Sequence, residues 1–206
     1  AKLVNLESLE LRENNLEALP LTIKLLTKLK LLDLGRNNLE ELQPEIGYLF
    51  NLQELILDEN ILQDVTVVGD LLNLRHLDLS ANNLMAFPDE ICNCTMLETL
   101  YGDGNEFQEL PEALGNLTKL TRLNMNYVAL KALPNSIGYL QSLEELNIYE
   151  NYLEHLPSTI GFLRNLQFLV AYDNRLKDLP NELASCTNLT HLNVANNKLE
   201  RLPDNI

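Results

Sequence analysis

Apolar residues recur at a fixed interval along the whole chain. The repeating phrase is LxxLxLxxNxLxxLPxxIxxLxx, and the stretch from Leu143 to Leu163 carries it almost complete. Successive copies are spaced by 23, 23, 22 and then five times 23 residues. Nine consecutive matches predict an array in which every repeat forms the same structural unit. The copies open at Leu6, Leu29, Leu52, Leu74, Leu97, Leu120, Leu143, Leu166 and Leu189.

The spacing within one repeat predicts its structure. Alternation with period two points Leu146 and Ile148 inward from a short strand, while Glu145 and Asn147 point outward. The LPxxIxxL segment turns the chain back and buries its apolar residues from the other side, through a short helix or 3₁₀ turn. Stacking of neighbouring repeats then buries the apolar side chains that a single repeat leaves exposed. We expect an α/β leucine-rich solenoid of nine 22–23-residue repeats over residues 1–206, with a parallel concave sheet and short helices on the convex side.

A column of asparagines follows the expected strands. An Asn amide both donates and accepts hydrogen bonds, so it can satisfy the backbone of a bend within and between coils. We interpret the column as a buried structural ladder rather than a ligand groove. Its members are Asn14, Asn37, Asn60, Asn82, Asn105, Asn151, Asn174 and Asn197.

Some repeats depart from the phrase. Val128 stands where the sixth asparagine belongs, and the third repeat is one residue short and lacks its proline. Gly102 and Ala171 replace a large inward residue. These changes represent either sequence drift or local adjustments that matter for docking.

Neither end carries the polar cap that solenoids need to cover their last apolar face. Leu3 already fits the late apolar position of a preceding repeat, and the chain stops at Ile206, inside the ninth. We therefore expect an uncapped piece of a longer array, with other domains and targeting signals outside it.

Charge and cysteine usage narrow the classes of function. The 30 acidic and 15 basic residues give a net charge of −15, which argues against binding to nucleic acid or an anionic membrane. No apolar run is long enough for membrane insertion. Three cysteines, without a paired framework, favour the reducing cytosol. Against this stand sequons at Asn93, Asn116 and Asn188, although the last two follow from the repeat phrase itself.

The phrase resembles the intracellular class of leucine-rich repeats, and most closely the LAP group of cell-polarity scaffolds, Scribble, Erbin and Densin. The stretches NLESLELRENNLEALP (5–20), LKLLDLGRNNLEEL (29–42) and LNIYENYLEHLPSTIGFLRNL (146–166) carry the resemblance. Plant intracellular repeats and the Ras-pathway leucine-rich scaffold use nearly the same phrase. The LAP resemblance implies a cytoplasmic protein, peripheral at the basolateral membrane or cell junctions, with PDZ domains beyond the array.

The outward positions of the strands predict where a partner binds. Repeats one to four present an acidic end that includes Asp33 and Asp58, which would steer a basic segment of a partner. Repeats five to eight present aromatic residues, which are typical interface anchors. The predicted site comprises Tyr101, Asp103, Arg122, Tyr127, Glu145, Tyr149, Phe168, Tyr172 and Asp173. The alternative interpretation is scattered surface residues without a common role.

The sequence does not predict an enzyme, a cofactor or a metal site. His76 and His191 are five repeats apart and cannot share a proton relay, and no phosphate loop or zinc motif appears. We expect a scaffold that binds a protein or peptide on its concave face. A regulator of a small GTPase or a phosphatase complex is the alternative, and an extracellular receptor ectodomain comes third.

Overall fold

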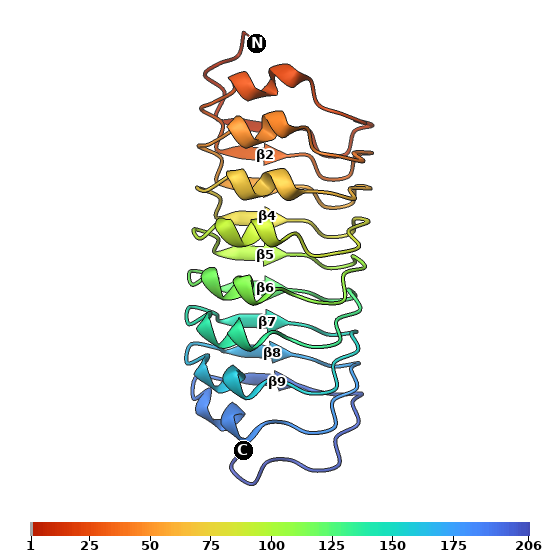
Figure 1. Cartoon of the computed structure of the whole chain (residues 1–206), viewed down its shortest axis with the longest axis vertical. Coiled ribbons are helices and arrows are strands. Elements are labelled where there is room, and N and C mark those ends of the chain that lie inside the picture. Colours follow the sequence, from red (N-terminus) through yellow and green to blue (C-terminus); the bar gives the residue numbers. More distant parts are fainter. Residues whose placement is uncertain (1) are drawn as a thin grey trace.

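The structure is a computed structural model that describes residues 2–206. Each repeat forms one coil, and the coils stack one above another with a strand on one side and a short helix on the opposite side (Figure 1). The strands are β1 (Ser8–Glu10), β2 (Leu31–Asp33), β3 (Glu54–Ile56), β4 (His76–Asp78), β5 (Thr99–Tyr101), β6 (Arg122–Asn124), β7 (Glu145–Asn147), β8 (Phe168–Val170) and β9 (His191–Asn193).

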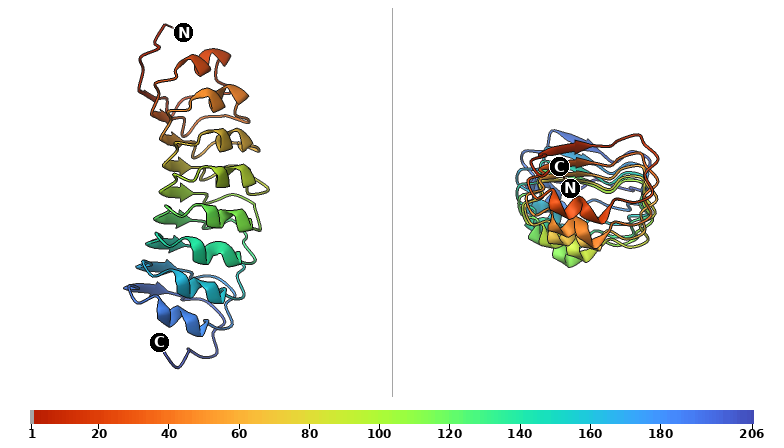
Figure 2. Two further views of the ribbon diagram at one scale, coloured as in Figure 1. Left: turned by 60° about the vertical axis from the view of Figure 1, so that its left-hand side comes forward. Right: turned by 90° about the horizontal axis from the view of Figure 1, so that it is seen from above.

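Eight 3₁₀ helices return the chain on the side away from the strands. They are η1 (Leu21–Leu25), η2 (Pro44–Tyr48), η3 (Thr66–Asp70), η4 (Asp89–Asn93), η5 (Glu112–Asn116), η6 (Asn135–Tyr139), η7 (Ser158–Phe162) and η8 (Asn181–Ser185). The nine strands form one parallel sheet in chain order. The stack curves gently, with the strands along its inner side (Figure 2). The predicted leucine-rich solenoid is confirmed.

Register is conserved from strand to strand. Equivalent residues pair at every step, as Leu123 pairs with Leu146 and Leu146 with Leu169. The inward side chains of adjacent coils therefore lie one above another and form a continuous core. Leu146 and Ile148 are fully buried, whereas Glu145 and Asn147 stay partly exposed, as the alternation predicts.

The asparagine column lies inside the bend after each strand. Asn60 is typical: its amide nitrogen donates to the carbonyls of Leu34 and Leu57 at 3.0 Å each, and its amide oxygen accepts from the Leu39 N–H at 3.0 Å. Each such side chain therefore joins its own coil to the preceding one. Asn14 is different, because its amide donates only within its own coil.

The bend also requires an unusual backbone. The residue just before each ladder position has a positive φ, and in eight of the nine repeats it is not glycine. Gly104, with φ of 65°, occupies this position in the fifth repeat. An L side chain is disfavoured in this conformation by roughly 1–2 kcal/mol, so the ladder holds the bend against a local preference.

The departures from the phrase are absorbed by packing. Gly102 leaves room for Met125 and Phe107, whose Sδ and Cζ atoms would lie 2.9 and 3.2 Å from a side chain at that position. Val128 is completely buried and simply joins the core. In the shortened third repeat, Val65 adopts φ −137° and ψ 25° before η3, where the other helices follow an extended residue.

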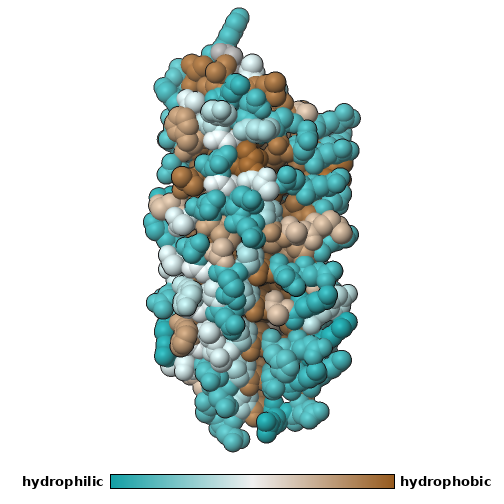
Figure 3. All heavy atoms as spheres, in the orientation of Figure 1, coloured by the Kyte–Doolittle hydropathy of each residue, from teal (hydrophilic) through white to brown (hydrophobic). Residues whose placement is uncertain are grey.

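The first and last coils are less well covered than the middle ones. Leu3, Leu202 and Ile206 are exposed, and the strand residue Leu192 is 36% exposed while its counterpart Leu123 is fully buried. Further exposed apolar side chains lie on and after the first helices, and Figure 3 shows such residues gathered toward the N-terminal end. In the described part of the chain, no helix has the length and apolar character needed to cross a membrane.

Candidate functional site

Three tyrosines form a row at the edge of the sheet face. The rings of Tyr149 and Tyr172 stack, with centroids 4.5 Å apart and planes 7° from parallel. Tyr127 meets Tyr149 edge-on, with centroids 5.3 Å apart. We call Tyr127, Tyr149 and Tyr172 the tyrosine row. Its members come from consecutive coils: Tyr149 and Tyr172 are equivalent residues of the in-register array, whereas Tyr127 stands one position later in its own coil.

Polar side chains beneath the row connect its coils. The carboxylate of Asp103 accepts a hydrogen bond from the Asn126 N–H at 2.8 Å, and the Asn126 amide oxygen accepts one from the Tyr149 N–H at 2.9 Å. Asn126 is buried. These bonds lie next to Val128, where the ladder has no asparagine, and they tie the fifth, sixth and seventh coils together there.

The other predicted site residues lie on the same face but form separate contacts. Tyr101 packs edge-on against His76 at 5.5 Å between centroids, and Phe168 lies 6.0 Å from the ring of His191. Arg122 Nε is 3.6 Å from a carboxylate oxygen of Glu145. The structure thus places all of the predicted residues on one surface, but only the tyrosine row makes continuous ring contacts.

Burial and a neighbouring carboxylate raise the pKa of three of the aromatic site residues, Tyr101, Tyr127 and Tyr149. Partial burial raises the pKa of Tyr149, and burial likewise raises the pKa of Tyr101. A hydrogen bond with Glu150 raises the pKa of Tyr127 to about 12. Burial also raises the pKa of Asp103, which opposes the ionised form of that carboxylate. These shifts favour the neutral phenols of Tyr127 and Tyr149, which lie beside acidic groups.

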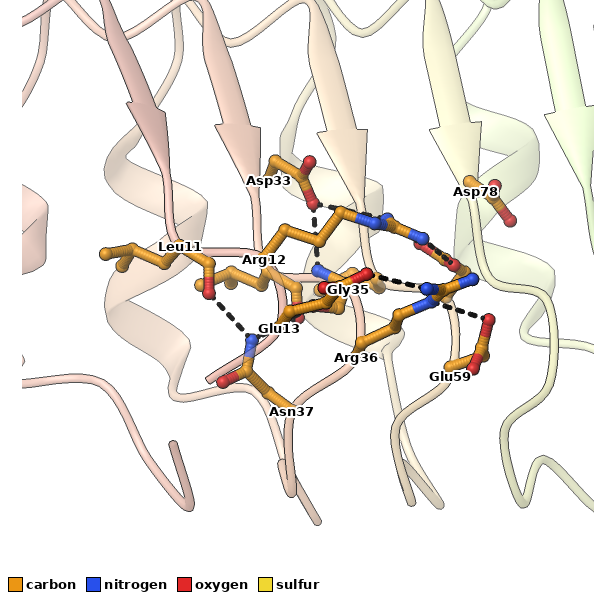
Figure 4. Close-up of polar contacts among 12 residues, drawn as sticks. Leu11, Arg12, Glu13, Asp33, Gly35, Arg36, Asn37, Glu59 and Asp78 are labelled. Carbon is orange, nitrogen blue, oxygen red and sulfur yellow. Dashed lines mark hydrogen bonds and ion pairs between the residues drawn. The ribbon is translucent and has the colours of Figure 1, made fainter. Parts of the chain in front are cut away.

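Two aspartates of the acidic end are less exposed than the sequence predicts. Asp33 and Asp58 are buried, 9% and 8% exposed, and are not free surface charges. The guanidinium of Arg12 donates two hydrogen bonds of 2.6 Å to the carboxylate of Asp58, and it lies 3.6 Å from that of Asp33 (Figure 4). The expectation that these aspartates are free charges on the surface is wrong, because both already have a cationic partner within the chain, while steering of a partner by this end stays a prediction.

A glycine makes this contact possible. Arg12 reaches from the first coil to the third across Gly35, where a Cβ atom would lie only 2.2 Å from the guanidinium nitrogen. Arg36, one coil later, pairs with Glu13 at 2.6 Å and with Glu59 at 2.9 Å on the more exposed side (Figure 4). Much of the acidic charge at this end is thus internally balanced.

Beside the tyrosine row the surface is hollowed. We call this the Ala129 hollow; its volume is about 790 Å³. It is lined by Asn105, Glu106, Gln108, Tyr127, Ala129, Glu150, Asn151, Tyr152 and Asp173. Of these residues the sequence interpretation placed only Tyr127 and Asp173 at the site. The available signal for the rest was the missing asparagine at Val128, which lies between two of the lining residues.

Neither the metal-ligand geometry nor the cysteines point to chemistry at this surface. No group of three or more His, Cys, Asp or Glu side chains could hold a metal ion within residues 2–206. Cys92, Cys94 and Cys186 are buried free thiols. Cys94 and Cys186 donate to the carbonyls of Val68 and Ile160 at 3.3 and 3.2 Å, as expected for small core residues.

Two family models match the chain. The leucine-rich repeat region model covers residues 62–154, and the leucine-rich repeats (two copies) model covers residues 164–206. The chain is thus a leucine-rich repeat protein. The matches name no finer group, so the LAP resemblance rests on the repeat phrases alone. No curated protein matches the chain.

Solved structures show the same fold. A leucine-rich repeat protein of Leptospira interrogans is 31% identical, with a TM-score of 0.80 over 98% of this chain and 58% of its own. The ectodomain of the Arabidopsis thaliana membrane receptor kinase GASSHO1/SCHENGEN3, in complex with CASPARIAN STRIP INTEGRITY FACTOR 2, is 36% identical, with a TM-score of 0.83 over 96% of this chain and 24% of its own. An internalin of Listeria monocytogenes, 24% identical, matches in fold with a TM-score of 0.86 over 100% of this chain and 58% of its own. This chain therefore spans less than two thirds of each.

Proposed function

We propose that the face formed by β5–β8 binds a partner protein or peptide, and that the protein acts as a cytoplasmic scaffold in cell polarity or junction organisation. The tyrosine row is the observation that supports a binding site on this face. Tyr127 is 51% exposed although its ring meets that of Tyr149 edge-on, so the row presents aromatic area to solvent. Aromatic residues of this kind are frequent hot spots of interfaces.

The experiment is partner capture followed by titration. The Tyr149→Ala, Tyr172→Ala double variant should lose binding by about thirtyfold or more, because truncation of central aromatic anchors commonly costs 2 kcal/mol or more. The whole chain is used to capture proteins from cytosol, and the identified partner is then titrated against each variant. Thermal unfolding of the variant should stay close to that of the wild-type chain.

The matched control removes two tyrosines from the opposite side. Tyr48 and Tyr139 lie on η2 and η6 and are 61% and 63% exposed. The Tyr48→Ala, Tyr139→Ala variant should bind the partner as the wild-type chain does. Equal loss of binding in both double variants would contradict the proposal, because it would place the interface away from the sheet face.

A receptor ectodomain is the second candidate, and one observation favours it. The plant ectodomain that is 36% identical to this chain was solved in complex with another named factor. The two candidates differ in compartment. The cytoplasmic proposal expects no glycan on Asn93, Asn116 or Asn188 of the native protein, and intact-mass measurement checks this. Glycan at any of these residues would favour the ectodomain instead.

A further inference from the structure

The Ala129 hollow arises where the regular coil is interrupted. In the flanking coils the equivalent position carries the larger residues Glu106 and Tyr152, whereas the sixth coil has only a methyl group. Ala129 also has φ of 68°, and among residues 2–206 no other repeat has a positive φ at this position. The small side chain and the altered backbone together leave the hollow open between two well-formed coils.

The missing ladder residue explains the altered backbone. In the next pair of coils the N–H of Tyr152 donates to the Leu130 carbonyl, and the N–H of Leu130 donates to the Asn151 side chain. The N–H of Phe107 has no equivalent bond within the described chain, because Val128 offers no acceptor, and the N–H of Ala129 does not donate to the Phe107 carbonyl either. The sixth coil is therefore free to leave the regular path.

The walls of the hollow are acidic. Glu106, Glu150 and Asp173 line it, and none of the three carboxylates takes part in an ion pair within residues 2–206. No lining residue is a cation. The nearest basic groups are already engaged: Lys131 donates to Gln108, and Arg175 lies over the ring of Tyr152. The hollow thus has negative charge without a positive partner.

The hollow also offers aromatic faces. Tyr127 and Tyr152 line it, and both are about half exposed. The Cζ atom of Arg175 lies 4.3 Å from the centroid of Tyr152, so one face of that ring already accommodates a guanidinium group. A planar guanidinium can stack on an aromatic ring and at the same time donate paired hydrogen bonds to a carboxylate, which an ammonium group cannot do.

We infer that the Ala129 hollow binds an arginine side chain of a partner segment that lies across the tyrosine row. The inference rests on the proposed function and specifies the chemistry of the partner. The tyrosine row supplies apolar contact area, and the adjacent carboxylates of Glu150 and Asp173 pair with the guanidinium. This site differs from the acidic end of the array, because the buried aspartates at that end already pair with Arg12.

A second hollow provides an internal comparison. It has a volume of about 740 Å³ and is lined by residues of the first three coils, among them Glu17, Glu40, Glu41 and Asp64. This hollow has four acidic lining residues against three in the Ala129 hollow, but it has no aromatic lining residue. Attraction by charge alone would therefore act on both hollows, whereas recognition of a guanidinium requires the aromatic walls of the first.

The test uses the whole ¹⁵N-labelled chain and a short peptide, acetyl-Gly-Ser-Arg-Ser-Gly-amide. The control peptide replaces arginine by citrulline, which has nearly the same shape and no charge. We expect saturable shifts of amide signals confined to residues around Ala129, Glu150 and Asp173. The citrulline peptide should bind about tenfold more weakly or not at all, as should the Glu150→Gln, Asp173→Asn variant with the arginine peptide.

The matched control variant is Glu40→Gln, Glu41→Gln, which removes the same charge from the second hollow and should leave arginine binding unchanged. Equal shifts with both peptides, or equal shifts at both hollows, would overturn the inference. The proposed function has a separate readout. If Tyr149→Ala, Tyr172→Ala loses the captured partner while Glu150→Gln, Asp173→Asn retains it, the tyrosine row is the interface and the arginine inference is wrong.

Discussion

A single ladder residue has a measurable energetic role. Asn82 is 5% exposed; its amide nitrogen donates to the carbonyls of Leu57 and Leu79, and its amide oxygen accepts from Leu62 N–H. The Asn82→Ala variant leaves these backbone groups buried without partners, which should lower the free energy of unfolding by about 1–3 kcal/mol. Thermal unfolding should shift by roughly 2–4 °C for each kcal/mol in a protein of this size.

The adjacent residue gives the control for that measurement. Asn83 is exposed, and its backbone N–H donates to the Leu62 carbonyl regardless of its side chain. Asn83→Ala should therefore unfold at nearly the wild-type temperature. If Asn82→Ala also unfolds like the wild-type chain, the hydrogen bonds of the ladder do not contribute to stability at this coil.

The buried thiols predict a dependence on pH. Burial raises the pKa of Cys94 to about 11 from an ordinary value of 9.0, because the charged thiolate is disfavoured in the core. Folding therefore favours the neutral thiol. This contribution to stability is fully present below pH 9 and is lost as the pH rises from 9 towards 11.

Labelling kinetics check the state of these thiols. At pH 8 an aromatic disulfide reagent should react with Cys94 far more slowly in the folded chain than in denaturant, since only the thiolate attacks and the side chain is buried. Rapid labelling of the folded chain would show that the coil around η4 opens readily.

Individual residues differ in how far the sequence could predict them. The ladder and the core leucines follow from the repeat phrase, because each sits at a fixed place relative to its strand. The burial of Asp33 and Asp58 could not be predicted in this way. It depends on Arg12 crossing an intervening coil, and the repeat pattern relates each residue only to its equivalent in the next coil.

At the level of elements, Arg12 joins three strands. Arg12 follows β1, and its guanidinium lies beside Asp33 at the end of β2. The same guanidinium donates two hydrogen bonds to the carboxylate of Asp58, which follows β3. The Arg12→Ala variant leaves two mostly buried carboxylates without a cation. Because the Arg12 side chain is one-third exposed, we expect a loss of about 1–3 kcal/mol, below the range for fully buried pairs. Urea unfolding measures the difference.

Arg36 is the matched control for the contact of Arg12 with Asp33 and Asp58. It also connects three coils, but its side chain is 47% exposed and its partners Glu13 and Glu59 are more than half exposed. Arg36→Ala should cost only about 0–1 kcal/mol, as surface ion pairs do. Similar losses for the two variants would mean that the burial of the aspartates does not govern the energy of the contact.

The elements themselves were largely predictable, whereas their surface contacts were not. The alternation and the LPxxIxxL segment identify each strand and each helical turn. The equivalent positions of Tyr149 and Tyr172 also predict that these residues are neighbours, since an in-register parallel sheet places equivalent residues about 4.8 Å apart. The Ala129 hollow required the structure, because it arises from an altered φ angle and two unformed hydrogen bonds in a single coil.

For the whole molecule, burial predicts a gradient of local stability along the stack. The strand residues Leu9 and Leu192 are partly exposed or exposed, while Leu100, Leu123 and Leu146 are completely buried. Amide hydrogens of β1 and β9 should therefore exchange faster than those of β5–β7, because opening an end coil breaks contacts with only one neighbour. Hydrogen-exchange mass spectrometry measures this profile. Identical exchange in all coils would show that the array opens only as one unit.

The unshifted register has a consequence for how such a chain can change in length. Removing the eighth repeat would join two coils that each carry the ladder asparagine, so the sheet and the ladder would continue unbroken. Deletion of the second repeat would instead bring Arg12 next to the coil that carries Asp58 and would remove Asp33 and Gly35 altogether. Insertion and deletion of whole repeats should therefore be tolerated unevenly, at a cost where side chains join unlike coils, as in the first three coils and in the fifth to seventh.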